Sequence, residues 1–205
     1  MPGVSETVVF ACSPRGGGNS DLAAALFAEG FAEAGGRARI VHLRDHAVTP
    51  CLGCRKCAVS PGNTCVLAAK DDCERLFGLI NRTPLAVFCA PIYFYHLPAG
   101  FKALIDRAQR FYEMRQTLQE LKPDRGEPAP RPARIVLVAG RPRGEKLFAG
   151  SLLTLTYFLQ CFRMEPAAPL TLRGLDAPGD LADDEESAEA VRAYGRLAWT
   201  ELANH

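Results

Sequence analysis

The amino-acid sequence predicts an α/β fold in which a doubly wound, five-stranded parallel sheet carries helices on both faces. Short apolar segments of strand length alternate along the chain with longer segments of helical length. The strand-like segments are apolar almost throughout, as burial on both faces of a parallel sheet requires. With 205 residues the chain is long enough for one domain with a sizeable core. We therefore expect a single domain over residues 1–205.

The first half of the chain contains three predicted strands and two predicted helices. The strands are β-branched and apolar runs bounded by turn residues, at Thr7–Cys12, Ala38–Leu43 and Leu85–Ala90. Helix formers with apolar residues at helical spacing predict a helix over Ser20–Gly35, and acidic residues at the start favour another over Asp71–Asn81. The segment at about 45–70 lacks either pattern and is predicted to be a loop insertion.

The second half continues the alternation. The pattern predicts a helix over Pro98–Glu113, a strand over Arg134–Gly140, an apolar helix over Glu145–Phe162, a weaker fifth strand over Pro166–Gly174 and a closing helix over Asp183–Ala203. The proline-rich and charged segment Lys122–Arg134 is expected to be an exposed loop. This order of elements matches the flavodoxin-like layout, whose ligands bind outside the carboxyl ends of the strands. Residues that follow a strand are therefore the candidates for a site.

Bulk properties exclude several classes of function. The net charge of +1 indicates no general attraction to nucleic acid or to acidic membranes. The longest apolar run contains a proline and is too short to span a bilayer, and the N-terminus lacks a basic region before its apolar run. We therefore expect a cytoplasmic protein without a membrane segment. Eight cysteines in 205 residues lie well below the roughly 8–10% of disulfide scaffolds, so thiol, metal or redox chemistry is favoured over disulfides.

The loop after the first strand has the composition of a phosphate site. Its glycines allow backbone N–H groups to approach a ligand, and the helix start behind it favours an anion. The candidate binding residues are Ser13, Arg15, Gly18, Asn19 and Ser20. The loop contains neither a Walker motif nor G-x-G-x-x-G, and no acid for a ribose hydroxyl ends the second strand. One phosphate, as in a mononucleotide, fits best; the alternative is a glycine-rich turn that only connects two elements.

Three consecutive aromatic residues follow the third strand. Tyr93, Phe94 and Tyr95 lie where they can form a wall for a flat ring, at the same edge of the sheet as the glycine-rich loop. The alternative is a hydrophobic loop that packs on the next helix or contacts another subunit.

Four cysteines occur together at the spacing C-x2-C-x2-C-x7-C. These are Cys51, Cys54, Cys57 and Cys65, in the stretch CLGCRKCAVSPGNTC. Three closely spaced thiols favour a [4Fe–4S] cluster, because a zinc site usually takes two separated C-x2-C knuckles. A Pro-Gly turn can bring Cys65 back as the fourth ligand, and Cys73 could replace it. Zinc and unmetallated thiols remain the alternatives.

The motifs SPRGGGNS, the cysteine block followed by KDD, and PIYFYHLPAGFKALIDR together resemble the NADPH-dependent FMN reductase family of the flavodoxin-like fold, in its iron–sulfur flavoprotein branch. The resemblance extends from about Val8 to Arg107. It implies that the glycine-rich loop binds the phosphate of FMN. It also implies that the ring is lined by Pro91, Ile92, Tyr93, Phe94 and Tyr95.

The chain also departs from the family pattern. Cys12 stands where glycine is frequent, and the similarity is weak after Gly140, where the family places a further ring contact. Lys102 and the Asp106-Arg107 pair match the family, and we expect them on a helix surface or at an interface.

The resulting prediction is an FMN-dependent electron-transfer flavoprotein or NAD(P)H-dependent oxidoreductase, with a [4Fe–4S] cluster next to the flavin. No side chain is expected to act as a general acid or base, because the flavin carries the redox chemistry. The alternatives are a cluster-free NAD(P)H:FMN or quinone reductase, a non-enzymatic flavodoxin-like electron carrier, and a metal sensor or thiol switch. The expected partners are a small-molecule or protein redox partner and further copies of the chain in a homodimer or homotetramer, with no nucleic acid.

Overall fold

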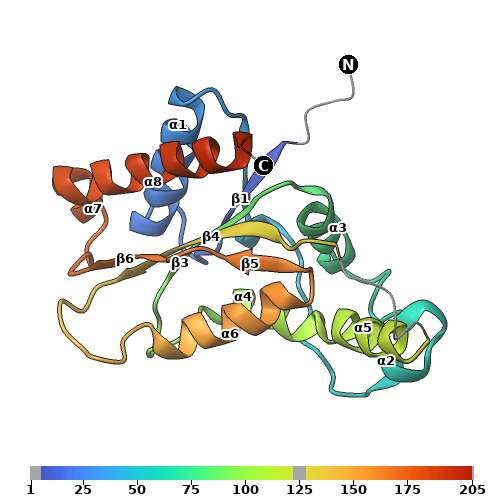
Figure 1. Cartoon of the computed structure of the whole chain (residues 1–205). Coiled ribbons are helices and arrows are strands. Elements are labelled where there is room, and N and C mark those ends of the chain that lie inside the picture. The colour runs from blue at the N-terminus through green and yellow to red at the C-terminus, as the bar shows by residue number, and fades with distance from the viewer. Residues whose placement is uncertain (1–5, 122–127, 205) are drawn as a thin grey trace.

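A parallel sheet forms the centre of the molecule (Figure 1). The computed structural model describes residues 6–121 and 128–204. The strands are β1 (Thr7–Ala11), β2 (Ala38–His42), β3 (Ala86–Pro91), β4 (Arg131–Ala139), β5 (Met164–Pro166) and β6 (Leu170–Arg173). They are arranged in the order β2-β1-β3-β4-β5, with β6 also paired to β4. All of these pairings are parallel, which confirms the predicted flavodoxin-like sheet.

The fifth position of the sheet is filled by two short strands instead of one. β5 pairs with Arg131–Ala133 at the start of β4, and β6 pairs with Val136–Ala139 at its end. Pro166 and Pro169 stand at the break between them. Proline has no N–H to donate to the ladder, so the pairing with β4 is interrupted here. The predicted strand over Pro166–Gly174 corresponds to β6, and β5 lies almost entirely before it.

Helices cover both faces of the sheet (Figure 1). One face carries α1 (Asn19–Glu33), α7 (Asp180–Asp183) and α8 (Glu185–Ala203). The other carries α3 (Cys73–Arg82), α4 (Ala99–Arg107), α5 (Gln109–Leu121) and α6 (Ala149–Gln160). A short helical turn, η1 (Leu43–Asp45), precedes the predicted loop insertion, and two others lie within it, α2 (Lys56–Val59) and η2 (Pro61–Asn63).

Each face of the sheet has its own apolar core. Val8 and Phe10 of β1 belong to the core under α3–α6, whereas Val9 and Ala11 belong to the core under α1 and α8. This alternation follows from the two-residue period of a strand. In the first core Phe10 and Phe88 stack with ring centroids 5.0 Å apart. Burial on both sides explains why the strands are apolar throughout.

The predicted helix over Pro98–Glu113 is divided into two. α4 ends at Arg107, and i→i+3 hydrogen bonds around Ala108 turn the chain before α5 begins. α5 then packs against α2 and η2 of the loop insertion. Residues 122–127 of the predicted exposed loop lie outside the described residues, and β4 begins at Arg131, earlier than predicted. Among the described helices, none has the length and apolar character needed to cross a membrane.

Candidate functional site

The loop between β1 and α1 is held in a tight turn by its own polar groups. The Ser13 hydroxyl donates to the Arg15 carbonyl (2.9 Å) and accepts from the Arg15 N–H (3.1 Å). Gly17 has φ of +67°, a conformation that side chains other than glycine's rarely adopt. Gly18 then serves as the N-cap of α1. We call residues 13–18 the phosphate loop below.

The start of α1 has the features of an anion site. A Cβ added at Gly18 would lie 3.3 Å from Nε and Nη2 of Arg15, so the guanidinium lies against the helix start. The first N–H groups of a helix have no intrahelical acceptor, and they add a partial positive charge there. Arg15 and these N–H groups together favour one bound phosphate.

The side-chain amide of Asn19 makes three hydrogen bonds within the protein. Its Nδ2 donates to the carbonyls of Leu175 (3.1 Å) and Ala177 (2.9 Å), and its Oδ1 accepts from the Leu181 N–H (3.2 Å). The amide therefore ties the start of α1 to the segment between β6 and α7. Only the backbone N–H of Asn19 is then left to contact a phosphate.

A cavity of about 160 Å³ brings the two predicted binding loops together. From the candidates of the sequence it is lined by Ser13, Arg15, Asn19, Ser20, Pro91, Ile92 and Tyr93. Two further walls come from the ends of other strands, at Val138, Gly140, Leu175 and Asp176. These four residues follow or end β4 and β6, so the rule that ligands bind at carboxyl ends would have found them. They form the wall of the cavity for which no residue could be predicted, because the similarity to the family is weak after Gly140.

The aromatic loop contributes one ring to this cavity instead of three. Tyr93 and His96 exchange two backbone hydrogen bonds of 2.8 and 3.0 Å around Phe94 and Tyr95, whose φ values are +50° and +61°. This is a type I′ turn, which glycine or asparagine usually forms. Phe94 is fully exposed at the tip, and the Tyr95 hydroxyl accepts from Nη1 of Arg141 (3.3 Å). Phe94 and Tyr95 lie outside the cavity lining, and their contact with a ring stays a prediction.

The four clustered cysteines line a second cavity of about 580 Å³ against α5. Cys51 and Cys54 are exposed, whereas Cys57 and Cys65 are partly buried. Burial and the nearby carboxylate of Glu113 raise the pKa of the Cys57 thiol. Within residues 6–121 and 128–204, no group of three or more His, Cys, Asp or Glu side chains could hold a metal ion. The thiols are thus gathered in one place without forming a ligand group.

Cys73, the proposed replacement ligand, lies elsewhere. It is fully buried in the core under α3, and burial raises its thiol pKa to about 12. It does not line the cavity of the other four cysteines. Its position at the first residue of α3 agrees with the predicted helix start.

Arg107 corrects the expectation of a helix-surface pair. Its side chain is 1% exposed, and its Nη1 donates to the carboxylate of Asp71 (2.6 Å) and to the carbonyl of Thr49 (3.0 Å). Burial by itself would raise the pKa of Asp71. Hydrogen bonds from Arg107 and from the N–H groups of Thr49 and Cys73 outweigh burial and lower it to about 2. Arg107 therefore anchors both ends of the cysteine-bearing loop to α4.

Comparisons with known proteins identify what the chain resembles. A family model described as NADPH-dependent FMN reductase matches residues 6–169. No curated protein matches the chain in sequence. An NAD(P)H:quinone oxidoreductase from Methanothermobacter marburgensis is similar in structure, with a TM-score of 0.66 and 17% identity over 94% of this chain and 96% of its own.

Two further solved structures have the same arrangement. A flavone reductase has a TM-score of 0.67 and 12% identity over 97% of this chain, which spans only 63% of that protein. A flavodoxin described as WrbA-like, from Agrobacterium tumefaciens, has a TM-score of 0.56 and 15% identity over 98% of this chain and 99% of its own. At these identities the structures show a shared fold, and the family model carries the assignment.

Proposed function

Because the chain belongs to the NADPH-dependent FMN reductase family, and is thus an FMN-dependent oxidoreductase, we propose that the cavity between the phosphate loop and the aromatic loop holds part of FMN. The observation that carries this proposal is the meeting of these two loops, about 80 positions apart in sequence, around one cavity at the carboxyl edge of the sheet. We further propose that NAD(P)H is the electron donor. The acceptor would be a small organic molecule of the quinone class, as the name of the M. marburgensis relative suggests.

The residues present fit the phosphate end of FMN. Arg15 would pair with the phosphate, and Ser20 and the first N–H groups of α1 would donate hydrogen bonds to it. The Ser13 hydroxyl donates to the Arg15 carbonyl, so Ser13 would shape the loop around the phosphate. The cavity is smaller than the roughly 300–1,000 Å³ of a complete small-molecule site, so it accommodates only part of the cofactor. Pro91, Ile92 and Tyr93 would border the ring. Bound FMN would supply the chemistry of the site, because a flavin can take up a hydride and release one or two electrons.

The protein's own residues have the tasks of binding and orientation. The phosphate loop would place one end of the cofactor through charge and hydrogen bonds, and the short aromatic turn would limit access of water to the ring edge. Asp176 and Gly140 approach each other closely on the far wall, since a Cβ at Gly140 would lie 2.3 Å from Oδ1 of Asp176. A larger side chain at position 140 would therefore displace Asp176 and change the shape of this wall.

The first experiment identifies the cofactor. Heat-released flavin from the purified protein, separated by chromatography, is expected to be FMN, because the loop suits one phosphate. FAD, or no flavin after incubation with FMN, would contradict the proposal. Arg15→Ala is expected to weaken FMN binding by about 1.5–3 kcal/mol, the range of a charge-assisted hydrogen bond. Arg37→Ala, an exposed arginine next to the amino end of β2, serves as the control and should bind FMN normally.

A second experiment separates a reductase from an electron carrier. Anaerobic mixing with NADPH or NADH should bleach the flavin absorbance in a reductase, and added quinone should restore it. A carrier of the flavodoxin type would react with reduced protein partners and not with the nicotinamide. Flavin that stays oxidised with both nicotinamides would contradict the proposed donor.

A second candidate function includes a [4Fe–4S] cluster. It is favoured by the four thiols of Cys51, Cys54, Cys57 and Cys65 on one cavity, although their present arrangement forms no ligand group. Anaerobic reconstitution is then expected to give about four irons and four sulfides per chain. Cys54→Ala should lose the iron and keep FMN, and Cys161→Ala, outside this cavity, should keep both. If the reconstituted protein contains zinc or no metal, the cluster is contradicted and the cluster-free reductase is supported.

We also propose that the protein is a cytoplasmic homo-oligomer. Several large apolar side chains are exposed. They include Leu52 and Val59 of the cysteine loop, Phe94 of the aromatic loop, Leu121 of α5, and Leu153 and Tyr157 of α6. Contiguous exposed apolar surface is typical of protein–protein contacts, and we propose that these side chains contribute to such a contact. Sedimentation should therefore show a species larger than the 22.2 kDa chain at micromolar concentration, and a monomer alone would contradict this.

A further inference from the structure

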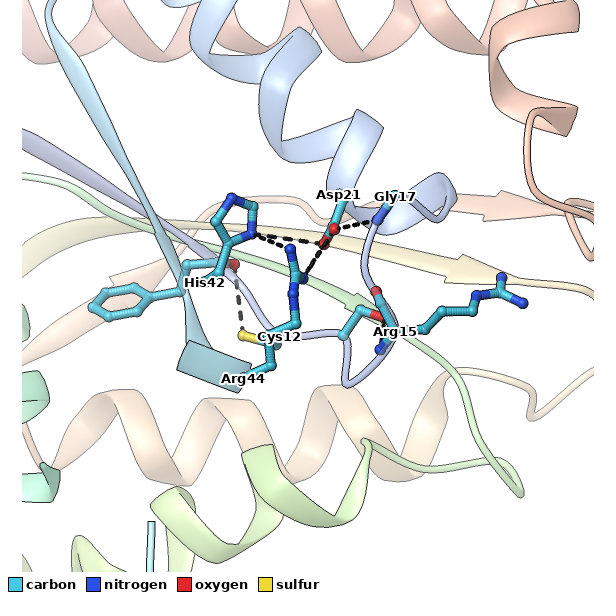
Figure 2. Close-up of polar contacts among 8 residues, drawn as sticks. Cys12, Arg15, Gly17, Asp21, His42 and Arg44 are labelled. Atoms are coloured by element: carbon cyan, nitrogen blue, oxygen red, sulfur yellow. Dashed lines mark hydrogen bonds and ion pairs between the residues drawn. The ribbon is translucent and has the colours of Figure 1, made fainter. Parts of the chain in front are cut away.

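The carboxylate of Asp21 lies beside the phosphate loop, although no role in binding follows from the sequence motif. Asp21 is in the first turn of α1, and its side chain is only 10% exposed. Its Oδ2 accepts a hydrogen bond from the Gly17 N–H at 2.9 Å. Asp21 therefore holds the loop at the glycine whose positive φ shapes the turn. Figure 2 shows the carboxylate between the backbone of Gly17 and the guanidinium of Arg44.

Arg44 neutralises this carboxylate. Its Nη1 lies 3.0 Å from Oδ1 and 2.9 Å from Oδ2 of Asp21. Its Nη2 lies 3.0 Å from Nδ1 of His42, which must accept this hydrogen bond because a guanidinium only donates. Arg44 belongs to η1, directly after β2, so the pair joins the start of α1 to the segment that follows the neighbouring strand β2.

Arg44 also lies beside the phosphate loop. A Cβ added at Gly16 would lie 3.7–3.8 Å from the guanidinium of Arg44, which is ordinary van der Waals contact. Arg15 lies against Gly18 on the other side of the same loop. Two guanidinium groups thus flank the glycines, and one of them is occupied by a carboxylate (Figure 2).

A carboxylate at this place has two opposing effects on a bound phosphate. It fixes the loop through Gly17, which favours binding, and it brings a negative charge toward a dianionic ligand, which opposes binding. The ion pair with Arg44 removes the second effect and keeps the first. We propose that the Asp21–Arg44 pair is a positioning device for the phosphate loop, in which Asp21 sets the loop's shape and Arg44 cancels the charge that would otherwise repel the phosphate of FMN. This inference rests on the proposed FMN site.

Fluorescence titrations with two flavins test the proposal. FMN carries the phosphate, whereas riboflavin has the same ring and ribityl chain without it. Arg44→Gln should weaken FMN binding about tenfold at low salt, the effect of one uncancelled charge, and should change riboflavin binding less than twofold. The loss for FMN should shrink as NaCl is raised, because salt screens the repulsion.

The partner substitutions separate charge from shape. Asp21→Asn keeps an oxygen for the Gly17 N–H and removes the charge, so FMN should bind at least as tightly as to the wild type. Asp21→Asn combined with Arg44→Gln should restore FMN binding to within about threefold of the wild type, because no charge is left to repel the phosphate. This double variant also answers the question if Arg44→Gln alone does not fold.

The matched control is an ion pair on the same helix at a distance from the loop. Arg192 Nε lies 3.0 Å from Oε2 of Glu29 in α1, and Arg192→Gln should leave both flavins bound as in the wild type. If Arg44→Gln weakens riboflavin as much as FMN, or if the double variant binds FMN as poorly as Arg44→Gln, the charge role is wrong. A wild type that binds no FMN would overturn the proposed function, and this inference with it.

Discussion

The strongest quantitative prediction concerns Arg107, whose ion pair with Asp71 is fully enclosed. Both side chains are 1% exposed, and the carboxylate also accepts the N–H groups of Thr49 and Cys73. Arg107→Met would remove the cation and leave the carboxylate buried. The loss of one partner of a buried ion pair costs about 3–5 kcal/mol, because the remaining charge is neither hydrated nor neutralised.

The same helix provides a matched control. Lys102 and Asp106 of α4 form an ion pair of 2.5 Å, similar in distance, but their side chains are 40% and 47% exposed. Lys102→Met should therefore lower the free energy of unfolding by less than about 0.5 kcal/mol. Urea unfolding followed by circular dichroism at pH 7 gives both values in the same assay. The difference between the two variants measures the effect of burial at nearly constant geometry.

A double variant tests the reason for the loss. In Arg107→Met combined with Asp71→Asn, no charge stays buried, and two buried guanidinium nitrogens without partners, Nε and Nη2, are removed as well. The double variant should be more stable than Arg107→Met alone. Equal losses for Arg107→Met and Lys102→Met, or a double variant that is less stable than the single one, would refute this reasoning.

Three further predictions follow from named contacts. The pKa of Asp71, lowered to about 2, implies a stabilisation of about 2 kcal/mol that is present above pH 4 and disappears as the pH falls toward 2. About half of it should be lost at pH 3, so the urea midpoint should fall further between pH 6 and pH 3 in the wild type than in Asp71→Asn, in which the other carboxyl groups still titrate. Gly18→Ala should weaken FMN binding by about 1.5 kcal/mol with little change in thermal stability, because the new Cβ would lie 3.3 Å from Nε and Nη2 of Arg15 and would displace the guanidinium. Unchanged binding in the fluorescence titration would contradict this. Gly30→Ala should lower the free energy of unfolding by about 1–3 kcal/mol, because its Cβ would lie 2.1 Å from the Arg192 carbonyl where α1 packs on α8. If the urea midpoint of this variant equals that of the wild type, the two helices can separate at this point and the reasoning is wrong.

The order of strands and helices could be predicted from the sequence because it depends on local pattern. An apolar strand such as Ala86–Pro91 is buried on both faces whatever its neighbours are, so its composition alone identifies it. The position of the phosphate loop follows from the same information. It comes directly after the first strand, and parallel strands of this layout place their carboxyl ends at one edge. The prediction of one fifth strand over Pro166–Gly174 found β6 and missed β5, although the prolines at 166 and 169 indicated a break in the ladder.

Contacts between distant parts of the chain were decided only by the tertiary structure. Asp21 and Arg44 are 23 positions apart, and Asn19 and Leu175 are 156 apart. No periodicity of the sequence specifies which of many arginines meets a given carboxylate, because that choice depends on how helices pack over the sheet. For the same reason Arg107 was expected on a surface and is buried: its neighbours come from a loop whose path is set by packing and not by its own residues. The arrangement of the four thiols likewise depends on how that loop folds against α5, which their spacing along the chain does not determine.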